Sequence, residues 1–86
     1  MSYVIAVFRN RTISMSFANN LRKFNVQSEI ISTPKELGST CGVSVKFPVA
    51  GLPKAKYLLN AYKYSSFVNF YKVMVIGNRR VFEIAR

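Results

Sequence analysis

Apolar and polar positions follow two different periods along this chain. Residues 3–8 form an almost unbroken apolar run rich in aromatic and β-branched side chains, which predicts a central strand buried on both faces. Asn10 then offers a helix N-cap. The next apolar side chains recur every three or four residues and predict a helix over residues 11–24, with one face in the core: Ile13, Phe17, Leu21 and Phe24.

Strand and turn signals alternate in the middle of the chain. Asn25 suits a left-handed residue after the helix, and residues 26–32 predict a second strand that ends at Pro34. Residues 43–47 alternate strictly between apolar and polar, which predicts a strand with one buried face. Pro48 closes that strand.

The last third predicts a helix and a terminal hairpin. Pro53 suits the first turn of a helix that ends near residues 64–66. The apolar face expected for this helix is Leu52, Ala55, Leu59 and Tyr62. Residues 67–76 and 81–84 read as two strands joined at Gly77-Asn78.

The element order predicts an α+β fold. Strands and helices follow each other as βαββαβ with an extra C-terminal strand, the order of the ferredoxin-like split βαβ arrangement. We expect a two-layer sandwich in which an antiparallel sheet carries both helices on one face and is extended by the extra strand. At 86 residues, we expect one ferredoxin-like domain over residues 1–86.

Charge and cysteine content narrow the function. Thirteen Lys and Arg residues against three acidic ones give a net charge of +10, which favours anionic partners such as nucleic acid or an acidic protein surface. Whether the charges form a patch is left open. With a single cysteine, no histidine and no signal-peptide pattern, we expect a cytoplasmic protein without an internal disulfide, metal site or cofactor. The longest apolar stretch is too short to cross a bilayer.

The candidate site is the ten-residue connection between the second and third strands, residues 33–42. It is longer than most hairpin loops and contains the only cysteine, Cys41. Gly42 permits a positive φ or close approach of a ligand, and nearby Lys35 and Lys46 favour the thiolate. Two alternatives stay open: Thr33 and Glu36 form a helix capping box, or Cys41 is a buried, inert side chain.

The segments Thr33-Pro34-Lys35-Glu36-Leu37 and Ser39-Thr40-Cys41-Gly42 resemble the motif of the putative selenium/sulfur carrier protein-like family. The resemblance extends over roughly residues 3–75. The family usually has arginine at the position of Lys35, and lysine keeps the charge but lacks the planar fork for bidentate anion binding.

The resemblance implies a non-catalytic carrier. Cys41 would hold sulfur or selenium as a persulfide or selenosulfide and exchange it with donor and acceptor proteins. The residues expected to bind or to stabilise the thiolate are Thr33, Pro34, Lys35, Glu36, Ser39, Thr40 and Gly42. A single thiol fits a carrier better than a dithiol oxidoreductase, which needs a resolving cysteine.

Two other functions remain open from the residues alone. A small basic nucleic-acid-binding module would use exposed aromatic and basic side chains of the sheet, namely Tyr3, Phe70, Tyr71, Arg79 and Arg80. No segment matches the basic-Gly-aromatic pattern of RNA-recognition strands. An interaction or assembly protein with an inert cysteine would form a homodimer through a sheet edge.

Overall fold

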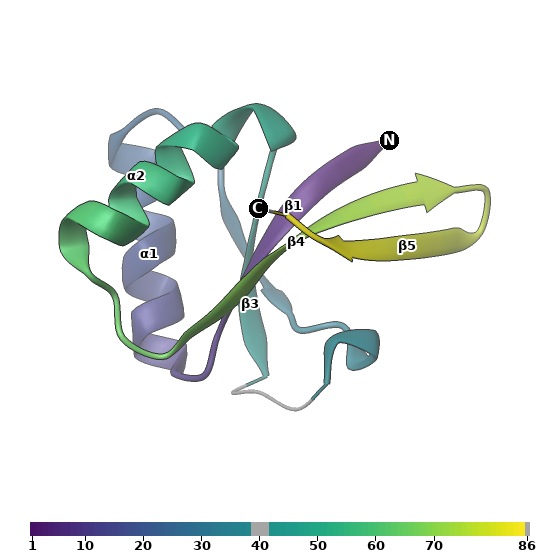
Figure 1. Cartoon of the computed structure of the whole chain (residues 1–86), viewed down its shortest axis with the longest axis horizontal. Helices are drawn as coiled ribbons and strands as arrows, with labels where there is room; N and C mark the ends of the chain where they lie inside the picture. The colour runs from purple at the N-terminus through teal and green to yellow at the C-terminus, as the bar shows by residue number, and fades with distance from the viewer. Residues whose placement is uncertain (39–41, 86) are drawn as a thin grey trace.

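A computed structural model of the chain describes residues 1–38 and 42–85. The fold is α+β, with two helices and a five-stranded antiparallel sheet (Figure 1). The strands are β1 (Ser2–Phe8), β2 (Glu29–Ser32), β3 (Val43–Phe47), β4 (Phe67–Ile76) and β5 (Arg79–Ile84). The helices are α1 (Arg11–Lys23) and α2 (Leu52–Tyr62), and short 3₁₀ turns precede β3 (η1, Lys35–Leu37) and α2 (η2, Val49–Gly51).

The strand order in the sheet is β2-β3-β1-β4-β5, and all neighbouring pairs are antiparallel. β1 therefore lies between β3 and β4, as its apolar run predicted. β3 separates β1 from β2, and β1 separates β3 from β4. Each helix thus connects two strands that are not direct neighbours in the sheet.

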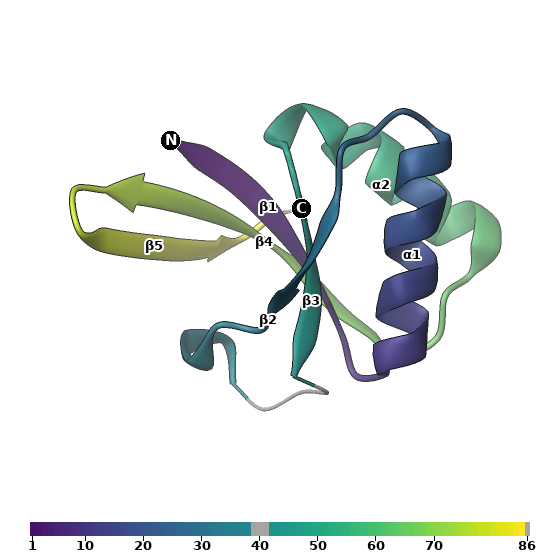
Figure 2. The same cartoon turned by 180° about the vertical axis from the view of Figure 1, so that it is seen from behind.

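β1 is buried on both faces of the sheet. Val4, Ala6 and Phe8 point toward the helices, where they pack with Phe17 and Leu58. The alternate side chains, Ile5 and Val7, point to the opposite face and are equally inaccessible to solvent. Among the residues that the structure describes, none from α1 or α2 belongs to this second cluster, so both helices cover one face, as Figures 1 and 2 show.

Local hydrogen bonds define both ends of α1, as the sequence predicted. The Asn10 side chain accepts a hydrogen bond from the Ile13 N–H at 3.0 Å. Asn25 has φ 64°, its N–H donates to the Arg22 carbonyl, and the Val26 N–H donates to the Leu21 carbonyl. This pair of bonds is a Schellman motif, which satisfies two carbonyls at the helix end.

β2 begins three residues later than predicted because residues 26–28 bind α1 instead of the sheet. The Val26 N–H belongs to the helix cap, and the Ser28 hydroxyl donates to the Ala18 carbonyl at 2.9 Å. β5 begins two residues earlier than predicted, since the two-residue turn at Gly77-Asn78 places Arg79 directly opposite Ile76.

The buried face of α2 differs in part from the predicted one. Ala55 and Leu58 are fully buried, whereas Tyr62, expected in the core, is 54% exposed. The helix ends earlier than expected, at Tyr62, and Lys63 follows in a left-handed conformation at φ 49°. Tyr62 is the last residue of the helix, and its ring packs against the Tyr64 ring, with centroids 6.0 Å apart, instead of entering the core.

We expect Gly51→Ala to destabilise the fold by about 1–3 kcal/mol through overpacking. A Cβ at this position would lie 2.7 Å from Val26 Cγ1 and 3.3 Å from Phe47 Cδ2. The φ of Gly51 is −84°, so the backbone itself accepts alanine. Urea unfolding of the single and double variants would measure the effect. If Val26→Ala does not relieve part of the loss in a double-mutant cycle, steric overlap is not its cause.

Candidate functional site

The candidate site is the connection from β2 to β3, residues 33–42. The structure describes Thr33 to Gly38 and Gly42. Ser39, Thr40 and Cys41 lie outside the described residues, so their expected roles remain predictions. The described parts show how the fold holds the chain on both sides of the cysteine.

Hydrogen bonds at the base of the connection continue the pairing of β2 with β3. The Thr33 N–H donates to the Gly42 carbonyl at 3.0 Å, one step beyond the Ser32–Val43 pair. The hydroxyls of Thr33 and Ser44 are 2.6 Å apart, and Ser44 is fully buried. Thr33 thus fixes where the connection leaves and rejoins the sheet.

The expected short helical turn is present, but the capping box is not. Lys35–Leu37 form the 3₁₀ turn η1, in which the Leu37 N–H donates to the Pro34 carbonyl at 3.0 Å. Pro34 is the N-cap, and no side chain caps the turn. The prediction failed because Thr33 and Glu36 bind partners elsewhere, Ser44 and Arg80.

The turn η1 covers the sheet face that the helices leave open. Leu37 packs against Ile5, Val7 and Val73 on that face. Beside it, Glu36 Oε2 lies 3.5 Å from Arg80 Nη2 of β5. The length of the connection therefore has a structural reason, since it closes the second core cluster.

Sequence reasoning missed the contact between Glu36 and Arg80. The two residues are 44 positions apart, and they meet because η1 packs on the open face of the sheet with residues of β4 and β5. The Arg80 guanidinium also lies over the Phe82 ring, 5.4 Å from its centroid. No short-range sequence pattern signals such a pair.

Of the two lysines expected near the thiol, Lys35 is an exposed residue of η1 and so belongs to the connection. Lys46 is directed elsewhere: its ammonium lies 3.5 Å from Glu29 and 4.5 Å from the centre of the Tyr3 ring. Lys46 lies three residues along β3 from Val43, which corresponds to about 10 Å at the usual rise per residue of a strand. A carboxylate already balances the Lys46 charge, so Lys35 is the better source of positive potential.

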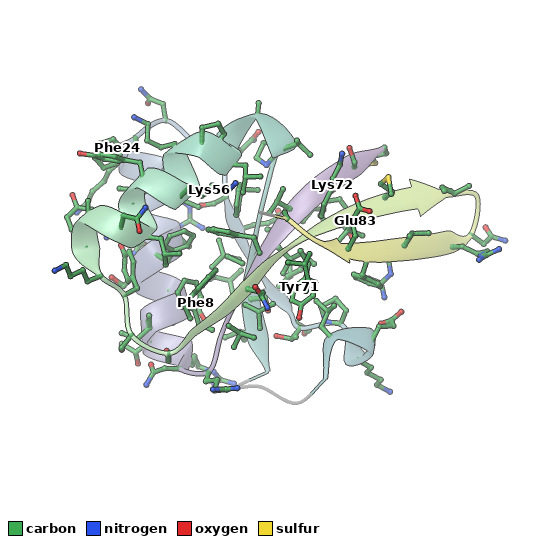
Figure 3. All side chains as sticks on the ribbon, viewed as in Figure 1. Phe8, Phe24, Lys56, Tyr71, Lys72 and Glu83 are labelled. Atoms are coloured by element: carbon green, nitrogen blue, oxygen red, sulfur yellow. The ribbon has the colours of Figure 1, made fainter. Side chains whose placement is uncertain are left out.

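The residues expected for nucleic-acid binding do not form one surface. Phe70 is only 4% exposed and packs on the helix side of the sheet. Tyr3 and Tyr71 lie on the opposite face, half-buried against the second cluster. Figure 3 labels Tyr71. Arg79 is exposed near the hairpin turn, whereas Arg80 pairs with Glu36. Phe70 cannot stack on a base without unfolding the core.

A shallow depression of about 340 Å³ lies at another end of the sheet. Its lining includes Tyr3, Ser28, Glu29, Lys46 and Pro48, and none of the described residues of the connection. Within residues 1–38 and 42–85, no three metal-ligating side chains cluster. Over the same ranges, neither helix has the length and apolarity to cross a membrane.

We expect Leu37→Ala to destabilise the protein by about 1–3 kcal/mol, because it uncovers Ile5 and Val7. Glu36→Gln should cost less than about 1 kcal/mol, since its ion pair with Arg80 is largely exposed. Urea unfolding at low and high salt separates the two effects. A larger loss from Glu36→Gln than from Leu37→Ala would show that the ion pair, and not apolar burial, holds the turn.

Comparison with known protein families identifies a family that matches most of the chain. The family described as Putative Se/S carrier protein-like matches residues 3–68, which include all of β1 except Ser2, both helices and the whole connection. No curated protein matches the chain, and no solved structure does. Because the match covers well over half of the 86 residues, the chain belongs to the putative Se/S carrier protein-like family.

Proposed function

We propose that this protein is a carrier that holds sulfur or selenium on Cys41 and passes it to a partner protein. Family membership carries this proposal. The chain's cysteine count supports it, since one thiol can be loaded and unloaded but cannot form an internal disulfide. The protein would act within a relay of donor and acceptor enzymes and would not itself be an enzyme.

The proposed transfer requires a thiolate on the carrier and no other catalytic group. The Cys41 thiolate attacks the outer sulfur of a donor persulfide, the donor S–S bond breaks, and the donor leaves as a thiolate. Attack on the selenium of a donor selenosulfide follows the same exchange. No net oxidation occurs, and the step needs neither a cofactor nor a histidine base. It does need a thiolate, which positive charge on Lys35 would favour.

The described geometry around the connection supports this role by holding its flanks in place. Thr33 and Ser44 fix its base, while Leu37 holds η1 on the sheet. Gly38 and Gly42 flank residues 39–41 with φ values of 86° and 91°. Because the chain is held in place on both sides of residues 39–41, less conformational entropy would be lost when Cys41 meets a partner protein.

We also propose that the domain, over residues 1–86, is ferredoxin-like with β5 added at one edge. Two split βαβ units support this assignment: β3 lies between β1 and β2, and β1 lies between β3 and β4. In this view the candidate thiol occupies the β2–β3 connection, at the end of the sheet where α1 begins.

Alkylation and sulfur loading test the carrier role directly. We expect Cys41 in folded protein to react with iodoacetamide faster than free cysteine at pH 7, because a larger fraction is thiolate. Incubation with a cysteine desulfurase and cysteine should add about 32 Da, and a selenium donor about 79 Da. Cys41→Ser is the control for the site of loading.

Equal or slower alkylation of the folded protein would argue against an activated thiol. The absence of any adduct on Cys41 after exposure to the donor would rule out the carrier role, leaving an interaction protein with an inert cysteine. Urea-unfolded protein provides the reference for the intrinsic reactivity of the same thiol.

A glycine pair tests whether backbone geometry at the connection matters for reactivity. Gly42→Ala and Gly77→Ala both place a side chain at positive φ, 91° and 61°, with no neighbour within 4 Å. Each should lose about 1 kcal/mol or more through strain, measured by urea unfolding. Only Gly42→Ala should change the alkylation rate of Cys41. The same change in rate from Gly77→Ala, at the distant hairpin turn, would mean that global stability sets the reactivity.

A further inference from the structure

A solvent-exposed cluster of two aromatic rings and one lysine joins the two helices. Phe24 follows the last turn of α1, and Tyr57 lies on α2, with ring centroids 6.5 Å apart at an interplanar angle of 72°. The Lys54 ammonium lies 5.1 Å from the centre of the Phe24 ring and 5.5 Å from that of Tyr57. We call Phe24, Lys54 and Tyr57 the helical cluster.

The helical cluster exposes aromatic surface to solvent, and this surface does not contribute to the core. Phe24 is 37% exposed and Tyr57 is 58% exposed. The apolar stripe of α1 predicted Phe24 in the core, but the helix ends at Lys23, and Phe24 departs from helical geometry with ψ 20°. Its ring contacts α2 at the surface instead of entering the core. Exposed aromatic surface beside a cation is typical of a binding site.

The charge around the helical cluster is of one sign. α1 carries Arg11, Arg22 and Lys23, α2 carries Lys54 and Lys56, and neither helix contains Asp or Glu. The three acidic residues of the chain are all elsewhere, Glu29 in β2, Glu36 in η1 and Glu83 in β5. Positive potential on the helical layer therefore has no local compensation, whereas on the sheet Glu29 and Glu36 each pair with a cation.

The helical cluster lies far from the candidate thiol connection. Figure 3 places Phe24 at the end of α1 remote from its start, while the connection extends from the sheet near the start of α1 (Figure 1). The longest dimension of the molecule is 36 Å. A partner bound at the cluster would leave the connection uncovered.

We propose that the helical cluster docks on an acidic surface of a partner protein. Lys54 would pair with a carboxylate, the Tyr57 hydroxyl can donate a hydrogen bond, and the Phe24 ring supplies apolar contact area. Aromatic residues, tyrosine among them, are enriched in interface hot spots, so Tyr57 is the expected anchor. Because α1 and α2 carry basic side chains and no carboxylates, an acidic partner surface would be electrostatically complementary to them.

Nucleic acid fits this cluster less well. Base stacking needs a free ring face, but Lys54 lies over both rings, and the rings stand nearly perpendicular to each other. Lys23 and Lys56 lack the planar guanidinium that stacks on bases. The guanidinium of Arg22 donates hydrogen bonds to the Ser28 carbonyl and to Asn19. The proposal is independent of the chemistry of Cys41 and stands or falls separately from the carrier role.

Amide chemical-shift mapping with a ten-residue glutamate peptide tests the proposal on the full chain. At low salt, we expect the largest shifts at residues 23–24 and 54–57. Lys54→Glu should weaken binding about fivefold, whereas Arg79→Glu, which makes the same charge change at the exposed hairpin turn, should weaken it less than about twofold. Tyr57→Ala should also weaken binding, although it removes no charge. Circular dichroism checks that each variant is folded.

Three results would overturn the proposal. Equal losses from Lys54→Glu and Arg79→Glu would show that only net charge matters. If Tyr57→Ala bound the glutamate peptide as tightly as the unchanged protein, the aromatic ring would not contribute to binding. Tighter binding of a ten-nucleotide oligouridylate than of the glutamate peptide, at the same residues, would assign the surface to nucleic acid.

Discussion

Burial of β1 on both faces is the constraint on which the rest of the structure depends. Val4, Ala6 and Phe8 need a cover on one side of the sheet, and Ile5 and Val7 need one on the other. The helices supply the first cover. They leave the second face open, and a short turn together with the β4–β5 hairpin must close it with Leu37, Val73 and Phe82. A connection of ordinary hairpin length could not reach that face, so the long β2–β3 segment follows from the apolar character of β1.

The connection therefore combines two tasks in neighbouring residues. Thr33 and Leu37 hold the segment by hydrogen bonding and apolar contact, while the proposed chemistry belongs to Cys41. This arrangement suits the proposed carrier role. Thr33 and Leu37 would hold the connection in the same way whether or not Cys41 carries sulfur or selenium. The helical cluster lies apart from the connection. A partner protein bound at the cluster would therefore not block access to the thiol.

Most of the fold could be predicted from local patterns. Asn10 and Asn25 mark the ends of α1 because they satisfy its terminal groups locally. The strand over residues 43–47 was also predicted, but its second face is not open to solvent as expected, since Ser44 is fully buried there beside the Thr33 hydroxyl. Errors arose where distant contacts override local ones. Residues 26–28 bind α1, Glu36 finds Arg80 across the sheet, and Phe24 lies outside the core because its helix has already ended. The position of the candidate connection was predicted correctly, but its packing over the open face could not be, since Leu37 meets residues of β1 and β4 that are distant in sequence.

The family match ends at Val68, in the second position of β4. Beyond it lie Val73 and Phe82, and most of the strand that pairs with β1 along residues 2–8. A polypeptide ending there would leave one side of β1 with unpaired backbone groups, an apolar edge prone to intermolecular association. The β4–β5 hairpin therefore completes the sheet beside β1 and covers part of the second core cluster, and through Arg80 it also contacts Glu36 in the β2–β3 connection.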